Sequence, residues 1–132
     1  MIEKYNKEDY LNIKSMHDEC VSDILIKDNN LVIIYDNIDE KIYKYKKLTI
    51  TYELDSYCDV LMFYKNNKYL FIDMISNYEK FKKLINKSQY RTYKYFISNF
   101  KEIELELTSI LKSKYYSLRI LLDPITITYH YE

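Results

Sequence analysis

The chain has 132 residues, a length typical of one globular domain and short for two independent folds. Hydrophobic residues make up 48% of it and charged residues 30%, which excludes the disordered and collagen-like classes. Lysine plus arginine and aspartate plus glutamate number 20 each, so a net charge of zero gives no bulk attraction to nucleic acid or to an anionic membrane. We therefore expect a single domain, residues 1–132, in which any recognition of charge is local.

Glycine is absent from the sequence. Dinucleotide-binding folds and phosphate-binding loops need glycine where the backbone takes positive φ or approaches a phosphate closely, and the nucleophile elbow needs small residues at a strained turn. None of these can be built here in its usual form. We therefore expect that the chain is not an enzyme and that it binds no cofactor.

The first nine residues are strongly charged, and no long apolar stretch follows them. This pattern predicts neither a signal peptide nor a transmembrane helix, so we expect a cytoplasmic location without membrane contact. Cys20 and Cys58 are far apart in the sequence. In a reducing compartment we expect buried thiols there rather than a disulfide.

The N-terminal third predicts a short helix followed by a hairpin. Asn6 is a suitable N-cap for a helix through residues 9–13. Runs of β-branched and aromatic residues at 21–27 and 31–35 then flank the polar residues 28–30. Because two of these three are asparagines, which tolerate the left-handed conformation, the segment predicts a β-hairpin.

The middle of the chain predicts strands and one helix. Residues 47–54 alternate between apolar and polar, which predicts a strand with one buried face. Residues 58–65 and 68–75 are apolar on both sides, and we expect them to be central strands. Ser76 and Glu79 match a capping box, so we expect a helix near 77–87. It should pack on the sheet through Phe81, Leu84 and Ile85.

The C-terminal part predicts two more hairpins, formed by the runs 92–100, 102–108, 115–122 and 125–131, with a break at Asp123-Pro124. The chain therefore reads as strands, helix, strands, without regular alternation of strands and helices. We expect an α+β, β-rich fold with a mostly antiparallel sheet of about eight to nine short strands, one helix near 77–87 and a short N-terminal helix.

His17, Asp18 and Cys20 form the tightest cluster of acid, base and nucleophile types. A nucleophile and its base must meet inside a water-excluding pocket, which neighbours at a helix–strand junction do not favour. We expect His17 or Asp18 to hydrogen-bond the junction backbone instead. A zinc site from His17, Cys20, Cys58 and His130 lacks any ligand pair at zinc-binding spacing, so we expect no metal.

Lysines and tyrosines alternate in the segments 42–47 and 90–96. Tyr43, Tyr45, Tyr93 and Tyr95 have the chemistry of a stacking platform for single-stranded nucleic acid. The zero net charge argues against it, and alternating tyrosine and lysine is also typical of an exposed strand. Nucleic-acid binding is therefore the third of the function hypotheses and is unlikely on these grounds.

Glu102, Glu104 and Glu106 place three carboxylates on one side of a predicted strand, roughly 7 Å from one to the next. Two interpretations stay open. The row is a solvated strand face, which also resists edge-to-edge aggregation if this is an exposed edge strand. Alternatively, the row is an acidic recognition stripe for a basic protein partner, because like charges held in a row are relieved by a cationic surface.

The stretch from Met16 to Ile24, followed by the run from Leu25 to Tyr35, resembles the opening of several groups of small uncharacterised bacterial proteins. In those groups a hydrophobic-His-Asp entry leads into the first β-hairpin. Some members are similar to immunity proteins that neutralise polymorphic toxins. The resemblance implies a binding protein rather than an enzyme, with His17 and Asp18 as structural landmarks.

The leading hypothesis is a small cytoplasmic protein-binding module of the immunity type, which occludes the surface of a toxin. The alternative is a β-barrel-like domain that holds a small molecule in a tyrosine-lined cavity, and an enclosed pocket would favour it. A β-rich chain of this kind could also form a homodimer through an exposed edge strand.

Overall fold

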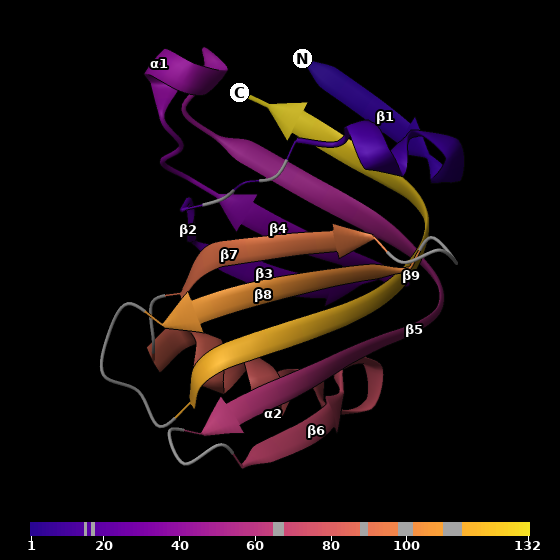
Figure 1. Ribbon diagram of the computed structural model, residues 1–132, viewed down its shortest axis with the longest axis vertical. Coiled ribbons are helices and arrows are strands. Elements are labelled where there is room, and N and C mark those ends of the chain that lie inside the picture. Colours follow the sequence, from indigo (N-terminus) through magenta and orange to yellow (C-terminus); the bar gives the residue numbers. More distant parts are fainter. Residues whose placement is uncertain (15, 17, 65–67, 88–89, 98–101, 110–114) are drawn as a thin grey trace.

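Two long antiparallel strands, β5 and β9, run through the whole molecule (Figure 1). The computed structural model describes residues 1–14, 16, 18–64, 68–87, 90–97, 102–109 and 115–132. Within these ranges nine strands form one sheet, in which every ladder is antiparallel. The predicted β-rich α+β fold is confirmed. The strands are β1 Ile2–Asn6, β2 Cys20–Val21, β3 Asp23–Lys27, β4 Asn30–Tyr35, β5 Leu48–Tyr64, β6 Tyr69–Asp73, β7 Tyr90–Ile97, β8 Ile103–Ser109 and β9 Tyr115–Tyr131.

The two halves of the β5–β9 ribbon have different neighbours. In one half, β1 pairs with β9, while β4 and then β3 extend the sheet from β5. In the other half, β8, β7 and β2 extend it from β9, while β6 pairs with β5. Figure 1 shows the ribbon curving strongly, so that β7 and β8 lie in front of β3 and β4. Buried side chains from both halves form one hydrophobic cluster.

The ribbon bends where its two strands lose regular pairing. Glu53 faces Thr126, Leu54 faces Pro124, and the next paired residue on β5 is Cys58. Proline has no N–H to donate to a ladder, so within a sheet it fits at such an irregularity. The inward face of β9 also changes there, because even-numbered residues are buried before the bend and odd-numbered residues after it.

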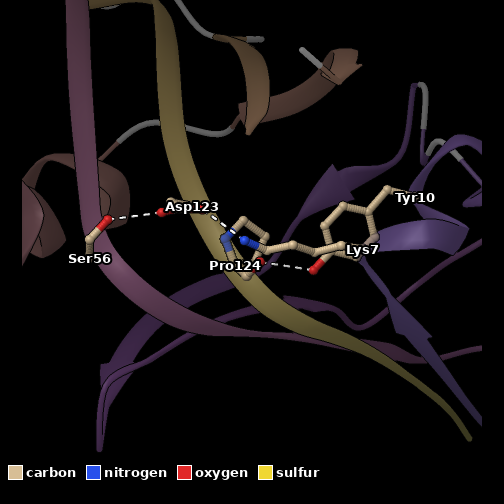
Figure 2. Close-up of polar contacts among 5 residues, drawn as sticks. All are labelled: Lys7, Tyr10, Ser56, Asp123 and Pro124. Atoms are coloured by element: carbon tan, nitrogen blue, oxygen red, sulfur yellow. Dashed lines mark hydrogen bonds and ion pairs between the residues drawn. The ribbon is translucent and has the colours of Figure 1, made fainter. Parts of the chain in front are cut away.

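Polar contacts from the N-terminal segment and from the facing strand β5 hold β9 at this bend (Figure 2). The Tyr10 hydroxyl donates to the Pro124 carbonyl at 3.0 Å, and the Ser56 hydroxyl donates to the Asp123 carboxylate at 2.9 Å. The Lys7 ammonium lies 3.7 Å from the same carboxylate. Tyr10 is fully buried, so its hydroxyl needs such a partner.

The bend overturns several predicted boundaries. The expected chain reversal at Asp123-Pro124 is wrong, because residues 115–131 form one bent strand. Residues 47–54 and 58–65 likewise belong to a single strand, so two of the strands are long rather than short. β6 is not central, since it pairs only with β5. Apolar residues on both faces of this segment did not predict a central strand correctly, because one apolar face of β6 is exposed.

The β3–β4 hairpin is confirmed, and asparagine and aspartate replace glycine in its turn. Asp28 and Asn29 have φ values of 50° and 62°, as a tight two-residue turn requires. Asn29 also contacts β5, because its carbonyl accepts from the Leu54 N–H at 3.0 Å and its side-chain amide donates to the Leu54 carbonyl at 2.8 Å. The preceding strand starts at Asp23 rather than at residue 21, since β2 pairs separately with β7.

Three helical segments are present in the described residues, and one of them was not predicted. The predicted N-terminal helix is the 3₁₀ helix η1, Lys7–Asn12, where the Asn6 N–H donates to the Asp9 carboxylate. The short helix α1, Glu40–Tyr43, was missed. Helix α2, Met74–Lys87, contains the predicted segment near 77–87 and begins before it.

The start of α2 corrects the predicted capping box. Asp73, the last residue of β6, accepts hydrogen bonds from the Ile75 N–H and the Ser76 hydroxyl, both at 3.0 Å. Ser76 therefore lies inside the helix instead of capping it, and Asn77 has non-helical dihedral angles. The predicted contacts of Leu84 and Ile85 lie outside the described side chains. Phe81 is fully buried in the common core, as predicted.

Replacement of Phe81 by alanine should lower the free energy of unfolding by about 3–5 kcal/mol, because the buried ring leaves a cavity under α2. Urea titration measures the loss. The matched control Lys83→Ala removes an exposed side chain of the same helix and should change stability by less than about 0.5 kcal/mol. Equal effects of the two substitutions would show that α2 is not docked through Phe81.

Candidate functional site

The three glutamates singled out in the sequence lie along the outer face of β8. Ile103, Leu105 and Leu107 point into the core as predicted, which leaves Glu104 and Glu106 half-buried on the opposite face and Glu102 exposed just before the strand. β8 pairs with β7 on one side and β9 on the other. Protection of an edge strand is therefore the wrong interpretation of this row, because β8 is an interior strand.

Neighbouring strands supply partners to the acidic row. The Arg119 Nε lies 3.8 Å from a Glu104 carboxylate oxygen, and the Ser117 hydroxyl donates to Glu106 at 3.4 Å. The Arg119 guanidinium also lies 4.7 Å from the centroid of the Phe63 ring, a cation–π distance. Arg119 thus connects the carboxylates of β8 to an aromatic ring on β5.

An exposed apolar patch continues this face across β5 and β6. Leu61 and Phe63 on β5 pair with Phe71 and Tyr69 on β6, and these four residues are called the outer patch below. Tyr69 is 64% exposed and Phe71 is 54% exposed. The Phe63 and Tyr69 rings lie 6.0 Å apart between centroids. The sequence showed the apolar character of these residues but did not show that their face is uncovered.

Two aspartates face each other at the rim of the outer patch. Asp59 on β5 pairs directly with Asp73 on β6. Burial and then the charge of Asp73 raise the pKa of the Asp59 carboxyl. Like charges directly opposite each other in a sheet are destabilising, so this rim favours a cation. Asp59 and Asp73 therefore lie at one end of the outer patch, and Glu104 and Glu106 lie on β8, separated from the patch by β9.

The other predicted site residues are not brought together. His17 lies outside the described residues, and Asp18 joins β7 through its backbone, where its N–H donates to the Thr92 carbonyl at 2.8 Å. The expectation of two buried cysteines is half wrong. Cys20 is exposed on β2, whereas Cys58 is buried and burial raises the pKa of its thiol.

The described residues contain no group of histidine, cysteine, aspartate and glutamate side chains that could hold a metal ion. His130 is exposed on β9, whereas Cys58 faces the core on β5. Cys20, on β2, lies at the far end of the strand order from either strand. Of the four residues considered as zinc ligands, the three that the structure describes, Cys20, Cys58 and His130, do not form a common site.

Of the four tyrosines considered for nucleic-acid stacking, two pack against the core, and the side chains of the other two lie outside the described set. Tyr43 and Tyr45 are half-buried against the core, and the Tyr45 ring lies 5.4 Å from that of Tyr131. The side chains of Tyr93 and Tyr95 lie outside the described set. Other tyrosines pack in the interior. The largest fully buried side chains of the described residues include Tyr10, Tyr52, Tyr90, Tyr129 and Tyr131.

A shallow polar hollow lies on the outer face of the other half of the ribbon. Its volume is about 340 Å³, and it opens to solvent between β1, β9, β5 and the β3–β4 turn. No tyrosine lines it, in contrast to the cavity that the small-molecule interpretation requires. Its lining is wholly polar and consists of Lys4, Asp28, Asn29, Asn30, Thr51, Glu53, Thr126 and Thr128.

Comparison of the chain with family models, with curated proteins and with solved structures finds no match. No helix in the described part of the chain is both long enough and apolar enough to cross a membrane. The candidate site therefore rests on geometry: an exposed apolar patch, one arginine and a carboxylate rim on a rigid sheet face.

Replacement of Asp59 by asparagine should stabilise the protein at neutral pH by about 0.2–1 kcal/mol, because it removes the repulsion from Asp73. The pKa of Asp59 is raised by folding, so the wild-type penalty is present above the folded pKa and fades as the pH falls through it. Urea titrations at about pH 7 and about pH 3 should therefore show a gain that shrinks in acid.

Asp55→Asn is the matched control, since Asp55 lies in the unpaired segment between Leu54 and Cys58. It makes the same charge change without a carboxylate opposite. A pH-independent gain at Asp59, or an equal gain at Asp55, would contradict the proposed repulsion.

Proposed function

We propose that this chain is a small cytoplasmic protein-binding module of the immunity type, which docks through its outer patch and thereby occludes a surface of its partner. The observation that carries the proposal is the exposure of Tyr69 and Phe71, at 64% and 54%, beside Phe63 on a regular sheet face. Large exposed apolar patches with a polar rim mark sites of protein association.

The residue types of the patch support protein binding. Aromatic side chains and arginine are enriched at interface positions that carry most of the binding energy, and this face combines Phe63, Tyr69 and Phe71 with Arg119. All four side chains extend from strands that are paired within the sheet, so little backbone ordering is needed on binding. Such a preformed face suits a protein that inhibits by covering its target.

The charges around the patch favour a basic partner. Four carboxylates, at Asp59, Asp73, Glu104 and Glu106, lie on the same outer face. Among the side chains that the structure describes there, Arg119 carries a positive charge between the two pairs. Complementary charges chiefly accelerate association and exclude wrong partners. An acidic rim around an aromatic centre is therefore suited to a target whose own functional surface is cationic.

The small-molecule alternative has less support. The polar hollow is open, and aliphatic or aromatic side chains that bury most of a ligand are missing from its lining. Binding of single-stranded nucleic acid has less support than either, because Tyr43 and Tyr45 are packed against the core.

Capture from a lysate of the native host, using immobilised wild-type chain, tests the outer patch. The double variant Tyr69→Ser, Phe71→Ser should lose the specifically captured protein, at least about tenfold in yield, because it removes both exposed rings. The control Leu11→Ser, Ile42→Ser removes two apolar side chains elsewhere that are more exposed, at 74% and 68%, and should retain the partner. Retention by both variants would contradict docking through the outer patch.

Replacement of Glu102, Glu104 and Glu106 by glutamine should slow association with that partner roughly 3- to 10-fold at low salt and less at moderate salt, because charges on a solvent-accessible face act mainly on the encounter rate. Surface plasmon resonance with the captured partner measures the rates, and urea titration should show folding nearly unchanged. The triple variant of Glu8, Glu40 and Glu79, three exposed glutamates elsewhere, carries the same charge change. Equal rates for the two triple variants would remove the row from the site.

A further inference from the structure

The polar hollow is lined by side chains whose polar groups the fold itself leaves unused. Its volume of about 340 Å³ lies at the lower end of the range for small-molecule sites. Within the described part of the chain, the side chains of Lys4, Asp28, Asn30, Thr51 and Thr128 form no hydrogen bond or ion pair. These side chains line one hollow although they come from four strands and a turn, so their donors and acceptors are available to a ligand.

The register of the sheet sets a cation at one side of the hollow. Lys4 on β1 pairs with Thr128 on β9, and Thr128 pairs in turn with Thr51 on β5. The three residues form one row across the sheet, in which a lysine is followed by two hydroxyl groups. β1 has β9 as its neighbour in the sheet, so Lys4 lies at the β1 side of the hollow.

Two carboxylates lie at the opposite side of the hollow. Glu53 on β5 pairs with Thr126 on β9, whose hydroxyl donates to the Glu53 Oε2 at 2.9 Å. This hydrogen bond orients the carboxylate and leaves its second oxygen available to a cation. Asp28 comes to the same side from the β3–β4 turn. Lys27 precedes it at the end of β3 and does not line the hollow.

We propose that the polar hollow binds a small zwitterion of the dipeptide type, with its carboxylate at Lys4 and its ammonium at Glu53 and Asp28. Lys4 and Glu53 are two strands and one row apart, so their backbones are separated by about 12 Å. An extended dipeptide spans about 7 Å between its charged ends, which leaves room for one ion-pair contact at each end. The threonine hydroxyls between the two sides can donate to its peptide carbonyl and accept from its peptide N–H.

The inference goes beyond the proposed function, because the polar hollow and the outer patch lie on different halves of the β5–β9 ribbon. It also differs from the tyrosine-lined cavity considered from the sequence, since no aromatic side chain lines the hollow. Solvent-accessible ion pairs contribute little free energy, so binding should be weak. We expect a dissociation constant on the order of 1–10 mM.

Titration of the isotope-labelled chain with L-alanyl-L-alanine at constant ionic strength and neutral pH, followed by amide chemical shifts, tests the proposal. The Thr51 and Thr128 amides should shift and reach saturation below about 100 mM ligand. N-acetyl-alanyl-alanine lacks the ammonium group, and alanyl-alanine amide lacks the carboxylate. Each of these blocked forms should bind about threefold more weakly than the dipeptide, because each loses one ion pair.

Two variants assign the two charged sides of the hollow. Lys4→Met should weaken dipeptide binding about threefold and should not weaken binding of the amide form, which has no carboxylate. Glu53→Gln should weaken dipeptide binding to a similar extent and should not weaken binding of the N-acetyl form, which has no ammonium group. The matched control Lys41→Met removes an exposed lysine of α1 and should bind the dipeptide as the wild type does. Urea titration checks the folding of each variant.

Three results would overturn the proposal. They are the absence of saturable shifts at the hollow, equal affinities for the dipeptide and its two blocked forms, and wild-type affinity for the dipeptide in either Lys4→Met or Glu53→Gln.

Discussion

The pairing of β5 with β9 is the constraint on which the rest of the molecule depends. Nearly every other strand adds to one edge of this ribbon directly or through a neighbour, so the ribbon fixes the strand order on both sides. Its bend near Pro124 lets the two halves enclose one core. Tyr10 and Ser56 hold the bend from η1 and from β5, which ties the N-terminal segment to the centre of the sheet.

The bend also gives the two halves of the β5–β9 ribbon different neighbouring strands and therefore different outer faces. Because side chains alternate along a strand, each half of the ribbon has one face toward the core and one toward solvent. In the half flanked by β1 and β4, the outer face is a threonine-rich polar hollow. In the half flanked by β6 and β8, it carries the outer patch, Arg119 and the carboxylates. One sheet thus presents two chemically different surfaces.

A chain without glycine must take its tight turns with other residues. Asp18, Asp28, Asn29 and Lys44 adopt positive φ, at a cost of roughly 1–2 kcal/mol for an ordinary side chain and less for aspartate and asparagine. Asn29 offsets part of this cost through its two contacts with Leu54. Its turn is thereby attached to the irregular segment of β5, so the hairpin and the bend support each other.

The sequence by itself determined the fold class, the β3–β4 hairpin, the docking of Phe81 and the inward row of β8, because each follows from local periodicity or turn chemistry. It did not determine that residues 115–131 form one strand, since a proline after an aspartate is typical of a break and becomes a bend only through Tyr10, Ser56 and the facing strand. Nor did it determine which apolar faces stay exposed. Phe71 and Ile72 are both apolar neighbours, and alternation places them on opposite faces of β6. Only the packing of one face against the core buries Ile72 and leaves Phe71 exposed. Which face meets the core depends on pairing between distant residues, which no local pattern encodes.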